Sequence, residues 1–335
     1  MIKNSLLVVL PAVFLILCVE FALRLFSPLY LVGSNDFYQY DSELGYVGKP
    51  GHHFKAKDYQ LESMVNVSGN IGFYENFSKY DKLIFTIGDS YTEGVGVPVD
   101  ASYPFHLDLL LNIDSKTRSY EKRFAVANFG LSGRGGLQNK LVIQKYSKDI
   151  GVPNYILYLG FDNDADDDVR FLSGAAEKSI ISGSPYWGVF YPIVNYFLVE
   201  TEIGKRLKYV VHIYRERSIS PTENGNGNED VSVSERQIEV LRQIFDIAKA
   251  QNSTLIVSWA VENEAYEYMK KFAAENNVHF ADWNSSVESV IRSMPKVEKE
   301  NLHSGGHYRS FVNYLIALAF VEEIKMVELS NKEGK

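Results

Sequence analysis

A serine that directly follows a short apolar run is the first residue in this chain whose position could do chemistry. Residues 83–87 form a mostly apolar run, LIFTI, and Gly88, Asp89 and Ser90 come immediately after it. A tight turn after a buried strand would place the Ser90 hydroxyl at the carboxyl edge of a sheet, where open α/β sheets keep their ligand sites. The helix behind such a turn would offer unpaired N–H groups to a developing anion. Ser90 is therefore the candidate nucleophile, while capping of an ordinary helix is the alternative for these three residues.

Three later turns are placed so that they could serve the same site. Residues 128–136 read NFGLSGRGG, residues 160–164 read GFDND, and residues 301–308 read NLHSGGHY. The first of these is so rich in glycine that a backbone N–H can approach a ligand closely. Because the carboxyl ends of parallel strands meet at one edge of a sheet, we expect these turns to lie near Ser90.

With these four segments in this order, the chain resembles the SGNH (GDSL) hydrolase superfamily over about residues 82–324. Residues 88–90 are similar to the family's first block, 130–133 to its second, 163–164 to its third and 307–313 to its last. The segments 23–28 and 41–46 are similar to those of exported, membrane-anchored members. The resemblance implies ester chemistry on the far side of a membrane, with no metal and no cofactor.

The roles of the residues follow from the chemistry of acyl transfer together with this resemblance. A serine hydroxyl needs a base to take its proton as it attacks a carbonyl, and an imidazole can return that proton to the leaving alcohol. His307 is the candidate for this base. The resemblance implies that the oxyanion is bound by the N–H of Ser90, the N–H of Gly133 and the side-chain amide of Asn163.

The residues around the candidate base depart from the family pattern. Ser304 stands three residues before His307, where the family usually has an aspartate, whereas His303 does have an acid, Glu300, three residues earlier. His303 is therefore the alternative base. We predict that an acceptor from elsewhere reaches the far ring nitrogen of His307: a main-chain carbonyl of its own loop, Glu300, or Asp282. Asp282 follows a predicted strand and so belongs to the same sheet edge.

Strand-like and helix-like segments alternate through the chain, which is typical of a parallel sheet. The sequence predicts a three-layer α/β/α domain of the flavodoxin-like kind with about five parallel strands. The expected strands are 83–87, 124–129, 155–159, 254–259 and 278–281. The expected helices are 102–112, 136–148, one from the capping box at 232–235 to about 248, 266–274 and 311–326.

The chain divides into segments of different character. We expect an N-terminal signal anchor or transmembrane helix at residues 1–28, a covering segment with small strands at 29–81, and the hydrolase-like domain at 82–326. An insertion at about 166–231 interrupts this domain. It could form either a helical hairpin packed on the domain or a lid. Residues 221–228 within it are expected to be a mobile loop.

The N-terminal apolar run predicts export. The uncharged residues 5–19 have the length of a signal-peptide core, and a helix running on to residue 26 could reach across a membrane. No cleavage site of small residues follows, so an uncleaved anchor with the bulk of the protein periplasmic or extracellular is favoured over a cleaved signal. Cys18, the only cysteine, lies in this run, which excludes a disulfide-stabilised fold.

Charge and residue spacing exclude other classes of function. The net charge of −8 argues against nucleic acid as a partner, because such proteins normally carry a basic face. The adjacent His52 and His53 point apart in an extended chain, and the acidic run that begins at Asp162 lacks the glycine and glutamate of an EF-hand loop. The prediction is thus a serine esterase that removes a small acyl group, acetyl being expected, from an acylated surface carbohydrate or lipid. An acyltransferase and a non-catalytic glycan-binding module are the alternatives.

Overall fold

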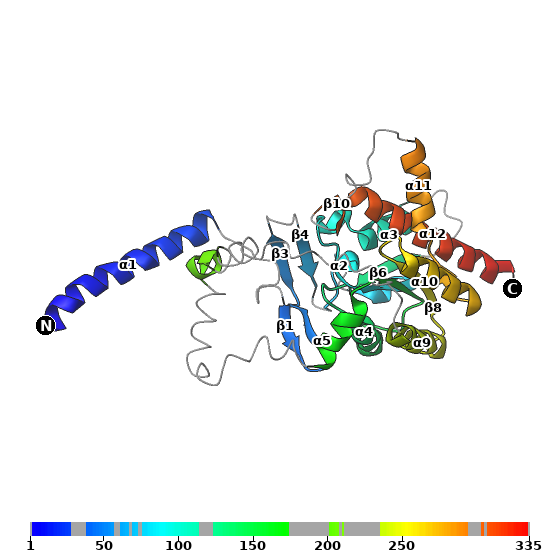
Figure 1. Cartoon of the computed structure of the whole chain (residues 1–335), viewed down its shortest axis with the longest axis horizontal. Coiled ribbons are helices and arrows are strands. Elements are labelled where there is room, and N and C mark those ends of the chain that lie inside the picture. The colour runs from blue at the N-terminus through cyan, green and yellow to red at the C-terminus, as the bar shows by residue number, and fades with distance from the viewer. Residues whose placement is uncertain are drawn as a thin grey trace.

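A five-stranded parallel sheet forms the centre of the protein (Figure 1). The computed structural model describes residues 2–27, 38–56, 61–66, 69–72, 76–113, 123–173, 201–207, 210, 235–293, 303–304 and 307–333. The strand order is β6-β5-β7-β8-β9, and the strands are β5 (Lys82–Gly88), β6 (Phe124–Asn128), β7 (Tyr155–Gly160), β8 (Thr254–Trp259) and β9 (His279–Phe280). The parallel sheet predicted from the sequence is confirmed.

The central strands are continuous apolar runs because helices cover the sheet on both faces. Every residue of β6 and β7 is buried. The pairing of Thr86 with Asn128 and of Gly88 with Leu159 brings the carboxyl ends of β5, β6 and β7 together. The three turns that follow these strands therefore start at one edge.

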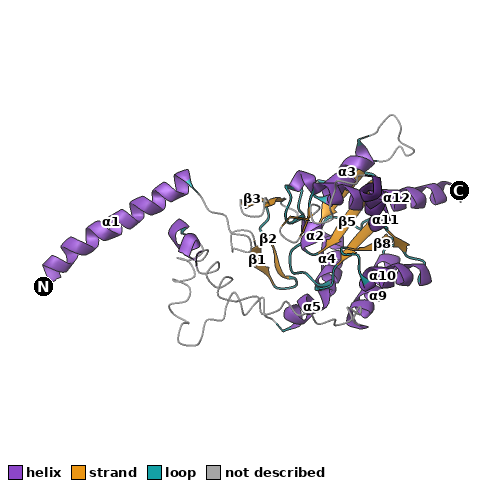
Figure 2. Ribbon diagram, turned by 45° about the horizontal axis from the view of Figure 1, so that its top comes forward, coloured by secondary structure: helices purple, strands orange, loops and turns teal. Residues whose placement is uncertain are grey.

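Two groups of helices lie on opposite faces of the sheet (Figure 2). On one face α12 packs against α3 and α11, and on the other α4 packs against α9. The crossover from β8 to β9 places α10 with α4 and α9, because such connections are right-handed. The bounds are α3 Tyr103–Asn112, α4 Gly136–Asp149, α9 Glu235–Ala250, α10 Glu264–Glu275, α11 Trp283–Ser293 and α12 Ser310–Glu333.

Several short elements differ from the sequence-based expectation. Helix α5 (Asp164–Leu172) begins directly after the third turn. The first residues of the expected insertion, from 166 on, are therefore part of this helix. Most of the rest of the insertion lies outside the described residues. His307 lies ahead of the last helix, on β11 (His307–Tyr308), which pairs with β10 (His303–Ser304). The remaining short elements are α2 (Ser90–Glu93), η1 (Phe77–Lys79) and η2 (Val99–Ala101).

The covering segment forms two hairpins against the domain. These are β1 (Tyr38–Asp41) with β2 (Gly45–Gly48), and β3 (His52–Ala56) with β4 (Leu61–Val65). Ile71 connects this segment to the sheet, since its N–H donates to the carbonyl of Asn128 at 2.7 Å. Ile71 also packs with Val65, Val99 and Leu131 in a second small core. Among the described residues no cluster of three or more His, Cys, Asp or Glu side chains could hold a metal ion.

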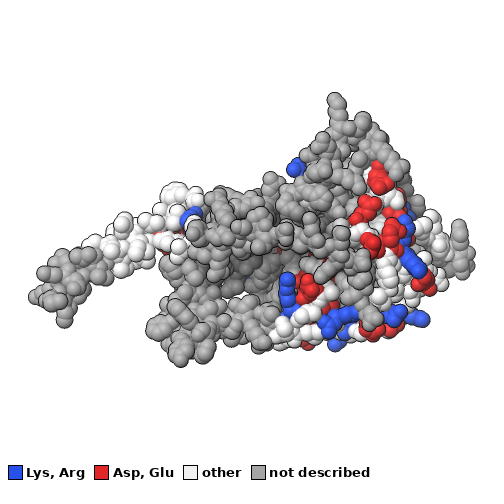
Figure 3. Space-filling view, viewed as in Figure 1, with Lys and Arg blue, Asp and Glu red and all other residues white. Residues whose placement is uncertain are grey.

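Helix α1 (Ile2–Phe26) stands apart from the domain (Figure 1). From Leu10 onward its side chains are exposed apart from Glu20 and Leu23, which are half-buried, and Figure 3 draws it almost without charge. Within the described residues, however, none of the helices combines the length and the apolar character that crossing a membrane requires. The transmembrane helix predicted here is therefore not confirmed. Glu20 accepts the N–H groups of Glu202 and Ile203 at 2.9 and 3.0 Å, which fixes the short helix at 202–207 beside α1.

Candidate active site

Ser90 is the first residue of α2 and lies directly after β5. Gly88 makes the sharp turn possible: its φ is +154°, and a Cβ would lie 2.3 Å from Thr92 Oγ1 and 2.5 Å from the carbonyl of Leu159. The buried Asn139 accepts the N–H of Gly88 at 3.1 Å. Asp89 Oδ1 caps the helix by accepting the N–H of Tyr91 at 2.9 Å. The backbone around the serine is thus held by the Asp89 cap of its own helix and by the Asn139 side chain of α4.

The structure brings Ser90 and His307 together. Their Oγ and Nε2 atoms are 2.9 Å apart, which is hydrogen-bonding distance. The strand that carries His307 is fixed by Asn313, whose Nδ2 donates to the carbonyl of Tyr308 at 3.0 Å and whose Oδ1 accepts the N–H of Tyr103 at 3.0 Å. The ring of Tyr91 packs 5.0 Å from that of His307. A serine hydroxyl and a positioned imidazole in this arrangement can act as nucleophile and base.

Asp282 is not the acceptor for the far nitrogen of His307, and that prediction is wrong. Its Oδ1 accepts from Tyr266 at 2.8 Å and its Oδ2 from Lys270 at 2.5 Å. The amine and hydroxyl together hold the pKa of Asp282 below its usual value against the effect of burial. Glu300 lies outside the described residues, as does the side chain of His303.

The turn after β6, which contains Gly133, is joined to the segment that carries the nucleophile. The N–H of Leu131 donates to the carbonyl of Gly88 at 3.3 Å, which joins this turn to the end of β5. The N–H of Arg134 donates to the carbonyl of Leu131 at 3.1 Å, and Gly133 has a φ of +75°. Among the acceptors that the structure describes, none receives the N–H of Gly133 or of Ser90.

Asn163 follows β7 and forms the N-cap of α5. Its Oδ1 is buried without a hydrogen-bond partner among the described residues. Helix α5 is held next to the turn after β6, because Asp168 Oδ1 accepts the N–H of Leu137 at 2.8 Å. Ser90, Gly133 and Asn163 thus follow the carboxyl ends of the neighbouring strands β5, β6 and β7, and His307 is hydrogen-bonded to Ser90.

Buried carboxyl groups lie directly beneath the site. Asp89, Asp164 and Asp168 are fully or almost fully buried. Burial raises the pKa of Asp89 to about 7 and that of Asp168 to about 6. Burial and the charge of Asp89 raise the pKa of Asp164 well above its usual value, and Tyr158 donates to its Oδ2. Folding makes these carboxyl groups harder to ionise, because few positive charges lie near enough to offset the loss of water around the carboxylates.

We expect the folded state to lose stability as the pH rises from about 4 to about 7, through the raised pKa of Asp89. A carboxyl whose pKa is higher in the folded than in the unfolded chain binds more protons when folded, so its contribution is complete below the unfolded pKa and disappears as the pH passes the folded one. Asp89→Asn should flatten this slope in thermal unfolding, since an amide mimics the protonated acid. Groups with lowered pKa, such as Asp41, oppose the slope equally in both proteins. Parallel curves would contradict the expectation.

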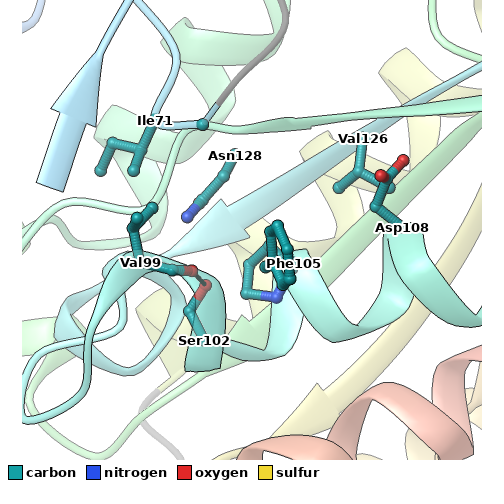
Figure 4. Close-up of a pocket in the computed structure, with 9 residues that line it drawn as sticks. Ile71, Val99, Ser102, Phe105, Asp108, Val126 and Asn128 are labelled. Carbon is teal, nitrogen blue, oxygen red and sulfur yellow. Dashed lines mark hydrogen bonds between the residues drawn. The ribbon is translucent and has the colours of Figure 1, made fainter.

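A separate cavity of about 170 Å³ lies between α3 and the edge strand β6 (Figure 4). Its lining includes Val99, Phe105 and Val126, with Asp108 and Asn128 as polar members. Neither Ser90 nor His307 lines it. This cavity is therefore not the space in which a substrate would meet the nucleophile.

Comparisons with known proteins give only a distant structural likeness. No family model and no curated protein matches the chain. A lipolytic protein of the G-D-S-L family from Veillonella parvula has a TM-score of 0.40 at 12% identity, covering 72% of this chain and 96% of that one. An acetyl xylan esterase from Geobacillus stearothermophilus has a TM-score of 0.39 at 16% identity, covering 73% and 95%. A psychrotrophic esterase from Pseudoalteromonas has a TM-score of 0.39 at 12% identity, covering 73% and 98%. Likeness at this level is not evidence of activity.

Proposed function

We propose that this protein is a serine ester hydrolase of the SGNH type. The observation that carries the proposal is the hydrogen bond of 2.9 Å between Ser90 Oγ and His307 Nε2. In the first step Ser90 Oγ bonds to the ester carbonyl carbon while His307 takes the hydroxyl proton, and the alcohol leaves with that proton. In the second step water attacks the acyl carbon while His307 takes a proton from the water. His307 then returns this proton to Ser90 Oγ as the bond between Oγ and the acyl carbon breaks, which releases the free acid.

The charge that develops on the carbonyl oxygen needs donors that are fixed before the reaction. The Ser90 and Gly133 N–H groups and the Asn163 amide would supply them, each being worth about 3 kcal/mol in the transition state. Because each of these donors stands on an element anchored to the sheet, the protein need not reorganise at the moment of reaction.

The substrate that we propose carries a small acyl group, acetyl first, on a carbohydrate or lipid of the cell surface. The rings of Phe161 and His307 pack 4.9 and 5.0 Å from that of Tyr91, so aromatic side chains crowd the surroundings of the base and favour a small group. A sugar hydroxyl could replace water in the second step, and the enzyme would then act as an acyltransferase.

One experiment tests the function and separates these outcomes. The purified protein is incubated with p-nitrophenyl acetate, with and without a polysaccharide acceptor, and Ser90 is examined for labelling by a fluorophosphonate. We expect labelling at Ser90 and release of free acetate. Acetylated polysaccharide in place of acetate would show a transferase, and an unlabelled, inactive protein that binds the glycan would show a binding module.

We further propose that α1 attaches the protein to a membrane, with the domain on the periplasmic or extracellular side. The exposed apolar side chains from Leu10 to Phe26 support attachment, because such a surface is costly to leave in water. We expect the protein to stay with the membrane fraction after a high-salt wash, and a chain starting at residue 29 to be released. Recovery of the full-length protein in the soluble fraction would contradict the attachment.

A further inference from the structure

The turn that carries Gly133 is held by side chains from outside it. Glu93, at the end of α2, is almost completely buried and accepts the N–H of Ser132 at 2.7 Å through Oε2. The Ser132 hydroxyl donates to the same oxygen. The carboxylate therefore fixes the first half of the turn to the helix that begins with the nucleophile.

A second contact comes from the N-terminal hairpin. The hydroxyl of Tyr46, on β2, donates to the carbonyl of Ser132 at 2.8 Å. The buried Arg134 closes the arrangement, because it donates to the carbonyl of Phe129 at 2.7 Å and to the carbonyl of Tyr46 at 3.2 Å. The hairpin thus donates one hydrogen bond to the turn and accepts one from it.

The carbonyl that Tyr46 holds belongs to the same peptide unit as the N–H of Gly133. In a trans peptide these two groups point in opposite directions, so fixing the oxygen fixes the direction of the N–H. Residues 131–134 form a turn closed by the Arg134 N–H to the Leu131 carbonyl, with Gly133 at φ +75° as in a type II turn. Type I and type II turns differ by a flip of this central peptide. A flip would turn the Gly133 N–H away from its present direction.

We propose that Tyr46 and Glu93 are positioning residues that keep this peptide in the orientation needed for the oxyanion hole. The proposal rests on the function proposed above and adds to it that the N-terminal hairpin is part of the catalytic unit. Tyr46 holds the carbonyl of the Ser132–Gly133 peptide, and Glu93 holds the N–H of the peptide before it. Neither residue touches the reacting atoms.

The test is Tyr46→Phe, which removes the hydroxyl and keeps the ring packing. A misdirected oxyanion donor weakens binding of the transition state more than binding of the substrate, so we expect kcat for p-nitrophenyl acetate to fall about tenfold with little change in KM. Tyr40→Phe, at an exposed tyrosine of the same hairpin, is the matched control and should behave like wild type. Glu93→Gln should also lower kcat, because the amide is a weaker acceptor for both Ser132 donors.

A purely structural role of Tyr46 would give a different result. Active-site titration with the fluorophosphonate counts competent molecules, and kcat is calculated per titrated site. If Tyr46→Phe lowers only the titrated fraction, or matches Tyr40→Phe in kcat, the positioning role is overturned while the hydrolase stands. If wild type shows no turnover and Ser90→Ala changes nothing, the proposed function fails and the positioning role fails with it.

Discussion

Ser90→Ala should lower hydrolysis of p-nitrophenyl acetate by at least about 10⁴-fold, because it removes the only atom that can form the acyl-enzyme. The fold should persist, since the hydrogen bonds of this hydroxyl within the described part of the chain go to His307 and, at 3.3 Å, to Asp89 Oδ2. Steady-state turnover measures the first effect and circular dichroism the second. Ser330→Ala, at an exposed serine on α12, is the control and should keep wild-type turnover.

The turnover that remains in Ser90→Ala shows whether another residue serves as the nucleophile. Turnover near the wild-type level together with fluorophosphonate labelling at another residue would remove Ser90 from its role. Loss of turnover with a changed circular dichroism spectrum would leave the role open, so the melting temperature of each variant is measured alongside the rate.

His307→Ala should lower turnover by about 10³- to 10⁴-fold, because without an acceptor for its proton the serine is a poor nucleophile. His303→Ala is the matched comparison, since it removes an imidazole from the neighbouring strand β10 and should leave turnover close to wild type. Rates are measured at a pH where imidazole is neutral. The reverse result would make His303 the base, with Glu300 as its partner.

If neither histidine matters, Ser90 does not act through an imidazole and the hydrolase proposal fails. Glu300→Gln refines a positive result. A loss in Glu300→Gln as large as that in His307→Ala would identify Glu300 as the group that orients the ring, whereas an unchanged rate would leave a main-chain carbonyl as the predicted acceptor.

The strands of the sheet were predictable from the sequence because each is a short apolar run bounded by turn residues. The predicted run 83–87 corresponds to β5, and the run 254–259 coincides with β8. The proximity of Ser90 to the turn of Gly133 followed from the same pattern, because parallel strands necessarily end at one edge. A strand that is buried on both faces needs apolar residues along its whole length, so its position can be predicted from the local sequence alone.

Contacts between distant segments were not predictable in this way. Asp282 does stand at the end of a strand, but Lys270 and Tyr266 on the preceding helix engage it, and strand position alone cannot show which neighbour a carboxylate meets. The contact of Tyr46 with Ser132 spans 86 residues and has no sequence pattern. The burial of Glu93, which makes its carboxyl group require donors, is a property of the folded structure and is not visible in the sequence.

The antiparallel bridge between Ile71 and Asn128 has a consequence for association between molecules. Strand β6 is the outermost strand of the sheet, and an outermost strand with open N–H and C=O groups can pair with another chain. Ile71 occupies the carbonyl of Asn128, so the covering segment blocks one end of this edge. The same segment that reaches the turn of Gly133 therefore also leaves less of the β6 edge open to pairing with another chain.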